Sequence, residues 1–339
     1  MGEASVTIER LETYLRGKSP HRQELSVVKL ERMTVGLSHD MYLFTMSWRE
    51  AQGPVTESLV IRMEPERGIL PPYDVRPQYE VLSKVQGTGI PVPKVPWLEM
   101  DSRVLGRPFF VMEMVDGEGL MAACTIHPEH QTQLGKGYPE LLTTIHGLDW
   151  QALGLASLGA PENDYQYAEK QIARWERLAE DNQYTPQPVI AELITWLKRN
   201  IPRAERTTLC HGDFHTENVL ARDGRIVAVL DWEMAGIGDP ISDIGYACMM
   251  SATFDNVPDV RAICPEADFI RGYEEMAGIK VSKESFLFWK VLSYVKLAAM
   301  GSRGMTMSIE SKDPDMRQFG SWLSFLPILL DQAARLIGF

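Results

Sequence analysis

Cysteines are few in this sequence, and those present are far apart. The four, Cys124, Cys210, Cys248 and Cys264, form no Cys-x-x-Cys pair. Such spacing argues against a disulfide framework and against a structural zinc site. A reducing compartment is the simplest expectation, so we expect the chain to work in the cytoplasm.

Long apolar runs are also missing. The most apolar segment near the carboxyl terminus, residues 322–330, is about half of the roughly 20 residues that a membrane-spanning helix requires. The first residues lead into a charged, amphipathic segment without the apolar centre of a signal peptide. We therefore expect no association with a membrane.

Basic charge is in deficit. The chain has 34 Lys and Arg against 46 Asp and Glu, a net charge of -12. Nucleic-acid binding depends on clustered basic residues and is therefore not expected. No internal repeat or low-complexity segment is present, and 339 residues suffice for one catalytic unit of two lobes.

The most informative segment is residues 211–220, His-Gly-Asp-Phe-His-Thr-Glu-Asn-Val-Leu, followed by an apolar run that ends at Asp231. Gly212 allows a sharp backbone turn before Asp213. Asp223-Gly224 lies between two apolar runs and predicts a hairpin. That hairpin would hold Asn218 and Asp231 close together.

Phosphoryl transfer from a nucleotide uses such a set of residues. A loop aspartate receives the proton of the attacking hydroxyl, while an asparagine and a second aspartate hold magnesium. Asp213, Asn218 and Asp231 fit these roles in order.

Other functions of the polar residues here stay open. His211 and His215 could bind zinc if they shared a helix face, but Gly212 and the strand pattern argue against a helix. We expect His211, and also His215, to brace the loop instead. Asp239 and Asp243 have the positions of helix caps, and we favour Asp243 as a brace of the catalytic loop.

These residues resemble the catalytic loop of the aminoglycoside phosphotransferase and choline kinase superfamily. The likeness continues into residues 235–246, which contain Gly-Asp-Pro-x-x-Asp. It implies an α+β, two-lobed, protein-kinase-like fold: a small β-rich nucleotide-binding lobe at residues 1–115 and a mainly helical lobe at 116–339. The resemblance also implies two cofactors, ATP and Mg²⁺, with GTP as an alternative to ATP.

The first lobe is expected to bind the nucleotide. Apolar patterns predict a helix at residues 8–15 and strands at 25–33, 40–48 and 57–63. Gly36 and Ser38, between the first two strands, resemble the family's phosphate loop, although many relatives have a second glycine there.

Arg62 stands where protein kinases place a phosphate-binding lysine, and its guanidinium can fork onto two phosphate oxygens. Its expected partner is Glu80, in a helix that begins near Pro77. Residues 59–62, Leu-Val-Ile-Arg, resemble the branch of kinase-like domains fused to acyl-CoA dehydrogenases. A surface arginine and a surface glutamate are the competing interpretations.

Residues 107–117 are predicted to form the hinge, where backbone groups near Glu113 and Val115 would contact adenine. The second lobe is expected to contain helices around residues 134–148, 168–179, 189–198, 285–301 and 320–337. His146 is expected to be a buried structural residue. Residues 302–315 read as a loop between helices, or as a flap over the substrate.

The expected reaction is ATP-dependent phosphorylation of a small-molecule hydroxyl, in a monomer or homodimer. The branch resemblance favours a metabolic alcohol or hydroxyacyl compound. An aminoglycoside or other antibiotic kinase and a non-catalytic pseudokinase are the alternatives. For an anionic acceptor we expect Lys170, Arg174 and Arg177 to line the cleft entrance from one helix face; the alternative is a solvated helix face.

Overall fold

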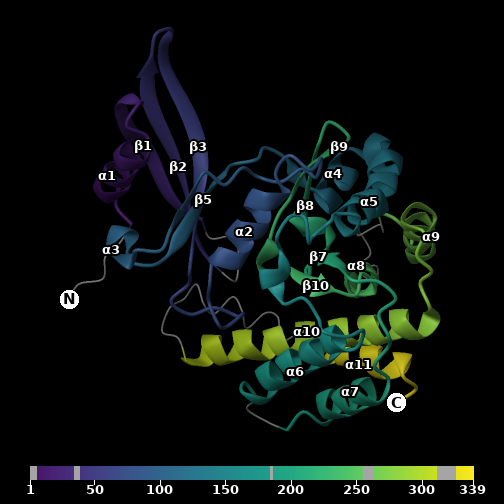
Figure 1. The fold of residues 1–339 in the computed structure, drawn as a ribbon. Coiled ribbons are helices and arrows are strands. Elements are labelled where there is room, and N and C mark those ends of the chain that lie inside the picture. Colours follow the sequence, from purple (N-terminus) through teal and green to yellow (C-terminus); the bar gives the residue numbers. More distant parts are fainter. Residues whose placement is uncertain (1–5, 34–38, 184–185, 255–262, 311–325) are drawn as a thin grey trace. The chain divides into compact units, whose positions relative to one another are not determined.

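The computed structural model describes residues 6–33, 39–183, 186–254, 263–310 and 326–339, which divide into two compact units (Figure 1). The first unit comprises residues 1–86 and 93–116, and the second comprises 87–92 and 117–339. The short segment 87–92 joins the second unit, and there the amide of Val229 donates to the carbonyl of Pro91 at 2.8 Å.

The first unit is built on an antiparallel sheet of five strands in the order β1-β2-β3-β5-β4. Its elements are α1 (Ile8–Lys18), β1 (Gln23–Met33), β2 (Asp40–Glu50), β3 (Gly53–Met63), α2 (Arg76–Val85), β4 (Trp97–Glu99), α3 (Ser102–Leu105) and β5 (Phe109–Glu113). The helix and strands expected here from the apolar patterns are therefore present.

Successive side chains of β3 point to opposite faces of this sheet. Ile61 belongs to a core that includes Leu11 and Leu15 of α1. The next residue, Arg62, must point to the opposite face because strand side chains alternate. Its register partner Phe110 lies against Tyr79 of α2, with ring centroids 6.2 Å apart. Arg62 therefore lies on the sheet face that α2 covers.

The second unit is mainly helical and contains two small sheets, β6-β8-β9 and β10-β7. Its helices are α4 (Leu120–Ile126), α5 (Gln131–His146), α6 (Gln166–Glu180), α7 (Pro188–Arg199), α8 (Ile241–Phe254), α9 (Glu266–Ala277), α10 (Lys283–Glu310) and α11 (Leu326–Leu336). Its strands are β6 (Glu118–Gly119), β7 (Thr208–Cys210), β8 (Val219–Arg222), β9 (Arg225–Val229) and β10 (Gly236–Gly238). Short 3-10 turns span Pro128–His130, Ala156–Leu158, Thr216–Asn218 and Trp232–Met234.

The hairpin predicted at Asp223-Gly224 is confirmed. Strands β8 and β9 pair antiparallel, with Arg222 opposite Arg225. The two residues between them both have positive φ, 51° at Asp223 and 72° at Gly224. This is the combination that a tight turn between twisted strands requires.

The loop expected at residues 302–315 is wrong for its described part, because α10 continues to Glu310; residues 311–325 lie outside the described residues. The small side chains that suggested a loop are used in packing instead. Ser302, Gly304 and Thr306 are buried in α10. The Thr306 hydroxyl donates to the carbonyls of Ser302 and Asn182, so it satisfies its hydrogen bonding without leaving the helix.

Helices α8 and α10 approach closely at Gly245, whose Cα faces the backbone of Trp289. A Cβ atom there would lie 2.8 Å from the Trp289 carbonyl carbon. Both partners are helix backbone, so relief requires the two helices to separate. Since α8 supplies a residue that braces the catalytic loop, this contact also fixes that residue's position.

We expect Gly245→Ala to lower the free energy of unfolding by about 1–3 kcal/mol, the usual cost of inserting an atom into a packed interior. Gly301→Ala in α10 is the matched control, because a Cβ there meets nothing within 4 Å and alanine favours a helix by about 1 kcal/mol. Urea denaturation of both variants checks the result. Wild-type stability of Gly245→Ala would contradict the close approach.

Candidate functional site

The predicted catalytic loop follows β7 and turns sharply at Gly212. Its φ is 80°, and a Cβ atom would lie 2.1 Å from the carbonyl oxygen of Met234. Any other residue would therefore be excluded both by the backbone conformation and by the lack of space. The turn leaves Asp213 partly buried, while His211 and Phe214 on either side are fully buried.

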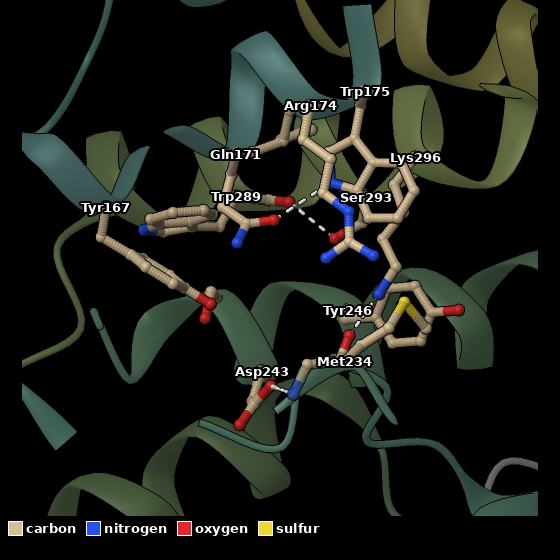
Figure 2. Close-up of a pocket in the computed structure, with 13 residues that line it drawn as sticks. Tyr167, Gln171, Arg174, Trp175, Met234, Asp243, Tyr246, Trp289, Ser293 and Lys296 are labelled. Carbon is tan, nitrogen blue, oxygen red and sulfur yellow. Dashed lines mark hydrogen bonds between the residues drawn. The ribbon is translucent and has the colours of Figure 1, made fainter. Parts of the chain in front are cut away.

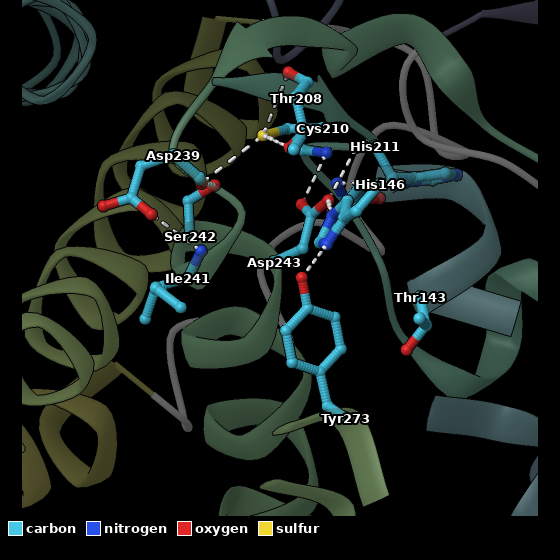
Figure 3. Close-up of polar contacts among 12 residues, drawn as sticks. Thr143, His146, Thr208, Cys210, His211, Asp239, Ile241, Ser242, Asp243 and Tyr273 are labelled. Carbon is cyan, nitrogen blue, oxygen red and sulfur yellow. Dashed lines mark hydrogen bonds and ion pairs between the residues drawn. The ribbon is translucent and has the colours of Figure 1, made fainter. Parts of the chain in front are cut away.

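A buried carboxylate on α8 holds this turn in place (Figure 3). Asp243 accepts the backbone N–H groups of His211 at 2.7 Å and Gly212 at 2.8 Å. It also accepts Nε2–H of His146 at 3.0 Å. Burial alone would raise the Asp243 pKa, but these donors outweigh it and lower the pKa. Asp243 is therefore charged, and its expected role as a brace is confirmed.

His146 is the structural histidine that the sequence led us to expect. Its imidazole is buried, and its Nδ1 accepts the hydroxyl of Tyr273 at 2.7 Å while Nε2 faces Asp243. Asp239 also behaves as a cap. It accepts the Ile241 amide at 2.9 Å and the Trp289 indole N–H at 2.8 Å, and burial raises its pKa to about 6.

The imidazole of His211 connects the loop to the end of the hairpin. Nε2 donates to the carbonyl of Leu230 at 2.8 Å, and Nδ1 accepts the amide of Asp213 at 3.1 Å. One donating and one accepting nitrogen describe a neutral ring, and burial lowers the His211 pKa in agreement with this state. His211 therefore braces the loop, as expected.

Asp213 and Asn218 form the polar centre of the site. The Asn218 amide donates to a carboxylate oxygen of Asp213 at 2.8 Å and to the Asp213 carbonyl at 3.0 Å. His215 Nε2 lies 3.5 Å from the same carboxylate. Burial by itself raises the Asp213 pKa. The contacts with His215 and Lys296 lower it by more than burial raises it, so the pKa lies far below the ordinary value. Asp213 is ionised at neutral pH.

The hairpin brings Asp231 to Asn218 as predicted from the turn. Val219 pairs with Val229, and the amide of Leu230 donates to the carbonyl of Asn218 at 2.8 Å. Asp231 follows directly in the left-handed region, with φ at 59°. This conformation is uncommon outside glycine and is found at functional sites. A carboxylate and an amide oxygen at this place are ligands that Mg²⁺ accepts.

Lys296 is a site residue that sequence reasoning missed. Its side chain comes from α10 and is buried; its ammonium donates to the Gly212 carbonyl and lies 3.8 Å from an Asp213 carboxylate oxygen. The Tyr246 ring lies 3.9 Å from it. Burial lowers the Lys296 pKa to about 8, although Asp213 opposes the shift. The available signal was a single charged residue within the largely apolar stretch 291–300 of α10.

A pocket adjoins this loop (Figure 2), and all of its lining residues belong to the second unit. Helix α6 supplies Tyr167, Gln171, Arg174 and Trp175; α8 supplies Ser242, Asp243 and Tyr246; α10 supplies Trp289, Leu292, Ser293 and Lys296; Gly212 and Met234 complete it.

Of the three basic residues of α6 expected at the cleft entrance, only Arg174 lines this pocket. Lys170 and Arg177 are exposed and are absent from the lining, and Arg177 lies 3.6 Å from Asp181. The lining positions recur at helical spacing from Tyr167, and of the three basic residues only Arg174 falls on that face.

In the first unit, the described contacts cover part of the predicted nucleotide site. Gly36 and Ser38 lie outside the described residues. Arg62 is buried, with a guanidinium nitrogen 3.3 Å from Nδ1 of His39. Glu80 accepts the ammonium of Lys84 at 2.8 Å. Pairing of Arg62 with Glu80 stays a prediction.

The predicted hinge begins at the end of β5, where Glu113 is the last residue of the strand. The Glu113 amide donates to the carbonyl of Lys94 at 2.7 Å, and its carboxylate accepts the Lys94 amide at 3.3 Å. A contact between adenine and the Glu113 amide would compete with the first of these bonds. The adenine contact expected at the backbone near Glu113 and Val115 stays a prediction.

One group among the described residues has the composition of a metal site: His146, Cys210 and Asp243. The histidine and the carboxylate are already committed to hydrogen bonds within the loop brace. Burial raises the Cys210 pKa well above the usual thiol value, and a metal would need the thiolate. We therefore assign no metal there.

The described helices include none long and apolar enough to cross a membrane.

Comparison with known proteins finds similar sequences among the acyl-CoA dehydrogenase family members and similar structures among the aminoglycoside phosphotransferases. Mouse acyl-CoA dehydrogenase family member 10 is 29% identical over 250 residues, which are 72% of this chain but 22% of that protein. The chain thus spans about a fifth of the length of this curated relative.

Two solved structures have a similar fold. A candidate aminoglycoside phosphotransferase of Ralstonia eutropha has a TM-score of 0.74 and 24% identity, over 97% of this chain and 98% of that one. A thermostable mutant of APH(4)-Ia, in a ternary complex with AMP-PNP and hygromycin B, has a TM-score of 0.61 and 16% identity, over 97% and 99%.

The predicted α+β, kinase-like fold is therefore confirmed. At the level of sequence, the model of the phosphotransferase enzyme family matches residues 29–279, about three quarters of the chain. This chain belongs to the phosphotransferase enzyme family.

Proposed function

We propose that the protein transfers the γ-phosphoryl group of ATP to a hydroxyl of a small metabolic alcohol or hydroxyacyl compound, with Mg²⁺ as cofactor. The observation that carries this proposal is the Asp213 carboxylate, bound by Asn218 and placed beside the hairpin that ends at Asp231. The acceptor oxygen bonds to the γ-phosphorus as the bond to the bridging oxygen of ATP breaks. ADP leaves, and Asp213 takes the hydroxyl proton.

The second unit offers a suitable set of donors for magnesium. Asn218 uses its NH₂ group for Asp213, so its amide oxygen faces elsewhere and can bind a hard cation. Asp231 adds a carboxylate from the end of the hairpin. When bound, Mg²⁺ would neutralise charge on the phosphates. The protein's own part is to hold these two oxygens on a rigid turn.

For the nucleotide we propose the first unit. Gly36 and Ser38 would cover the phosphates, Arg62 supported by Glu80 would bind them, and the backbone at Glu113 and Val115 would contact adenine. The burial of Arg62 on the α2 side of the sheet supports this role, because a buried guanidinium requires anionic or accepting partners. The related APH(4)-Ia structure contains AMP-PNP.

Two alternatives to this function remain. One has a different acceptor, and the other has no catalytic activity. An aminoglycoside kinase is the first, but the pocket beside Asp213 contains Arg174 and Lys296, which repel a polycation. A pseudokinase is the second, and the presence of all three polar catalytic positions disfavours it. Work in the cytoplasm remains part of the proposal, in keeping with four free cysteines.

Asp213→Asn should lower turnover by about 10²-fold or more, the usual contribution of general acid–base catalysis. Asparagine preserves the size of the side chain but cannot accept a proton. ADP release in the presence of an acceptor measures the loss, and ATP binding by calorimetry confirms that the fold is intact. Glu217→Gln, at an exposed loop position, is the control. Near wild-type turnover of Asp213→Asn would remove Asp213 from the chemistry.

Asp231→Asn should weaken magnesium-dependent ATP binding more than Asn218→Ala does. A carboxylate brings a full negative charge to a hard cation, while an amide brings a dipole. ATP is titrated calorimetrically with and without Mg²⁺ in each variant. If wild type and Asp231→Asn respond equally to Mg²⁺, Asp231 is not a metal ligand.

Turnover should fall as the pH rises through about 8, because the Lys296 pKa lies there. Below that pH the ammonium carries its charge and holds the Gly212 carbonyl; above it the charge is lost. Lys296→Arg keeps the charge at every accessible pH and should move this alkaline fall to higher pH.

Lys290→Arg is the matched control for Lys296, since Lys290 is another buried lysine of α10 and pairs with Glu266. It should leave the pH profile unchanged. Identical alkaline profiles in wild type and Lys296→Arg would assign the fall to another group.

A further inference from the structure

The pocket beside Asp213 is narrow and contains two cationic side chains. Its cavity volume is about 30 Å³, where one water needs roughly 10–15 Å³. A group of a few heavy atoms therefore fits inside it. The pocket is lined on one side by Tyr167 and Trp289, whose ring centroids are 5.5 Å apart.

Arg174 contributes a guanidinium that forms no ion pair among the described residues, and the Glu233 carboxylate acts on it electrostatically without such a contact. The structure gives it a contact with the neighbouring Trp175 ring, 4.8 Å from the guanidinium carbon, and no ion pair. Figure 2 shows the guanidinium pointing from α6 across the pocket toward Tyr246. Its neighbour on the same helix, Arg177, is instead paired with Asp181.

Lys296 provides the second positive charge, next to the catalytic carboxylate. Its ammonium donates to the Gly212 carbonyl and lies 3.8 Å from Asp213. Of its three N–H groups, one is used for that carbonyl, and an anion in the pocket can accept another. A group held there lies within a few bonds of a hydroxyl that is bound to Asp213.

Gln171 adds a polar group to the same wall. Its carbonyl oxygen accepts the Trp175 indole N–H at 3.1 Å, which orients the amide and leaves its NH₂ group to donate. The pocket thus combines a guanidinium, an ammonium and an amide donor, all of which suit a group with two acceptor oxygens.

We propose that this pocket binds the carboxylate of the acceptor, and that the acceptor is a short hydroxycarboxylic acid. The inference rests on the proposed phosphotransferase function and specifies its substrate class. Arg174 binds the carboxylate with its planar fork, and Lys296 bridges that carboxylate and the catalytic loop. A hydroxyl a few bonds away then reaches Asp213.

The size and charge of the pocket select this class over others. A phosphate group has five heavy atoms and a carboxylate three, and the smaller group suits the cavity volume. Neutral alcohols gain nothing from the two charges, and polycations are repelled by them.

Binding is tested first, without catalysis. Trp175 and Trp289 line the pocket, so its occupation should change tryptophan fluorescence. Lactate and hydroxybutyrate are titrated into the full-length protein with ATP absent, and their primary amides serve as neutral partners of the same shape. The acids should bind at least about tenfold more tightly than the amides, in line with hydrogen bonds between charged groups.

Arg174→Gln should remove this preference, so that acid and amide bind about equally. Arg177→Gln is the matched control, on the same helix but outside the lining, and should retain the preference. Turnover is then measured as ADP release with the same compounds and with kanamycin. The acid should be the better acceptor in wild type, and Arg174→Gln should raise its KM by about tenfold or more with a smaller effect on the amide.

The outcomes separate this inference from the proposed function. Equal binding of acid and amide in wild type overturns the carboxylate site, as does an equal loss of both in Arg174→Gln. Robust phosphorylation of kanamycin or of neutral alcohols, with no preference for the acids, overturns it while leaving the phosphotransferase intact. Specific binding of acids with no ADP release from any compound would sink the proposed function and retain the anion site.

Discussion

The proposed catalytic loop depends on one carboxylate, that of Asp243. It accepts the amides of two consecutive residues, His211 and Gly212, and the imidazole of His146. Two adjacent N–H groups directed at one carboxylate fix both the position and the direction of the chain that follows. Because Asp243, His146 and His211 are buried, each of these hydrogen bonds is costly to lose. Asp213 therefore has one orientation relative to α8.

The brace extends from the loop to the candidate metal ligands. His211 connects Asp213 to the Leu230 carbonyl, and the Leu230 amide binds the Asn218 carbonyl. The proposed base and both proposed ligands thus belong to one hydrogen-bonded unit. Preorganisation of this kind is what phosphoryl transfer needs, since its catalysis rests largely on positioning and charge.

The charges of Asp213 and Lys296 stabilise each other against the burial of both groups. Burial disfavours the ionised form of Asp213, yet contacts with His215 and Lys296 lower the Asp213 pKa enough to keep the carboxylate ionised. Lys296 in turn is held in its charged form by Asp213 against its own burial. In the proposed reaction the ionised carboxylate both orients the hydroxyl and accepts its proton.

The sequence by itself determined the features that depend on near neighbours. The glycine before Asp213, the Asp-Gly turn and the alternating strands on either side required no distant contact to be recognised, and they place Asn218 beside Asp231. Helical and strand periodicity likewise indicated the main elements of both units. Small residues in 302–310 misled the prediction because their role is to let other elements pack against α10, which no local pattern reveals. Only the tertiary structure decided that Lys296 reaches the catalytic loop and that Arg174, not Lys170 or Arg177, lines the pocket. Those outcomes depend on how α6, α8 and α10 pack, and packing is settled by residues that are far apart in the chain.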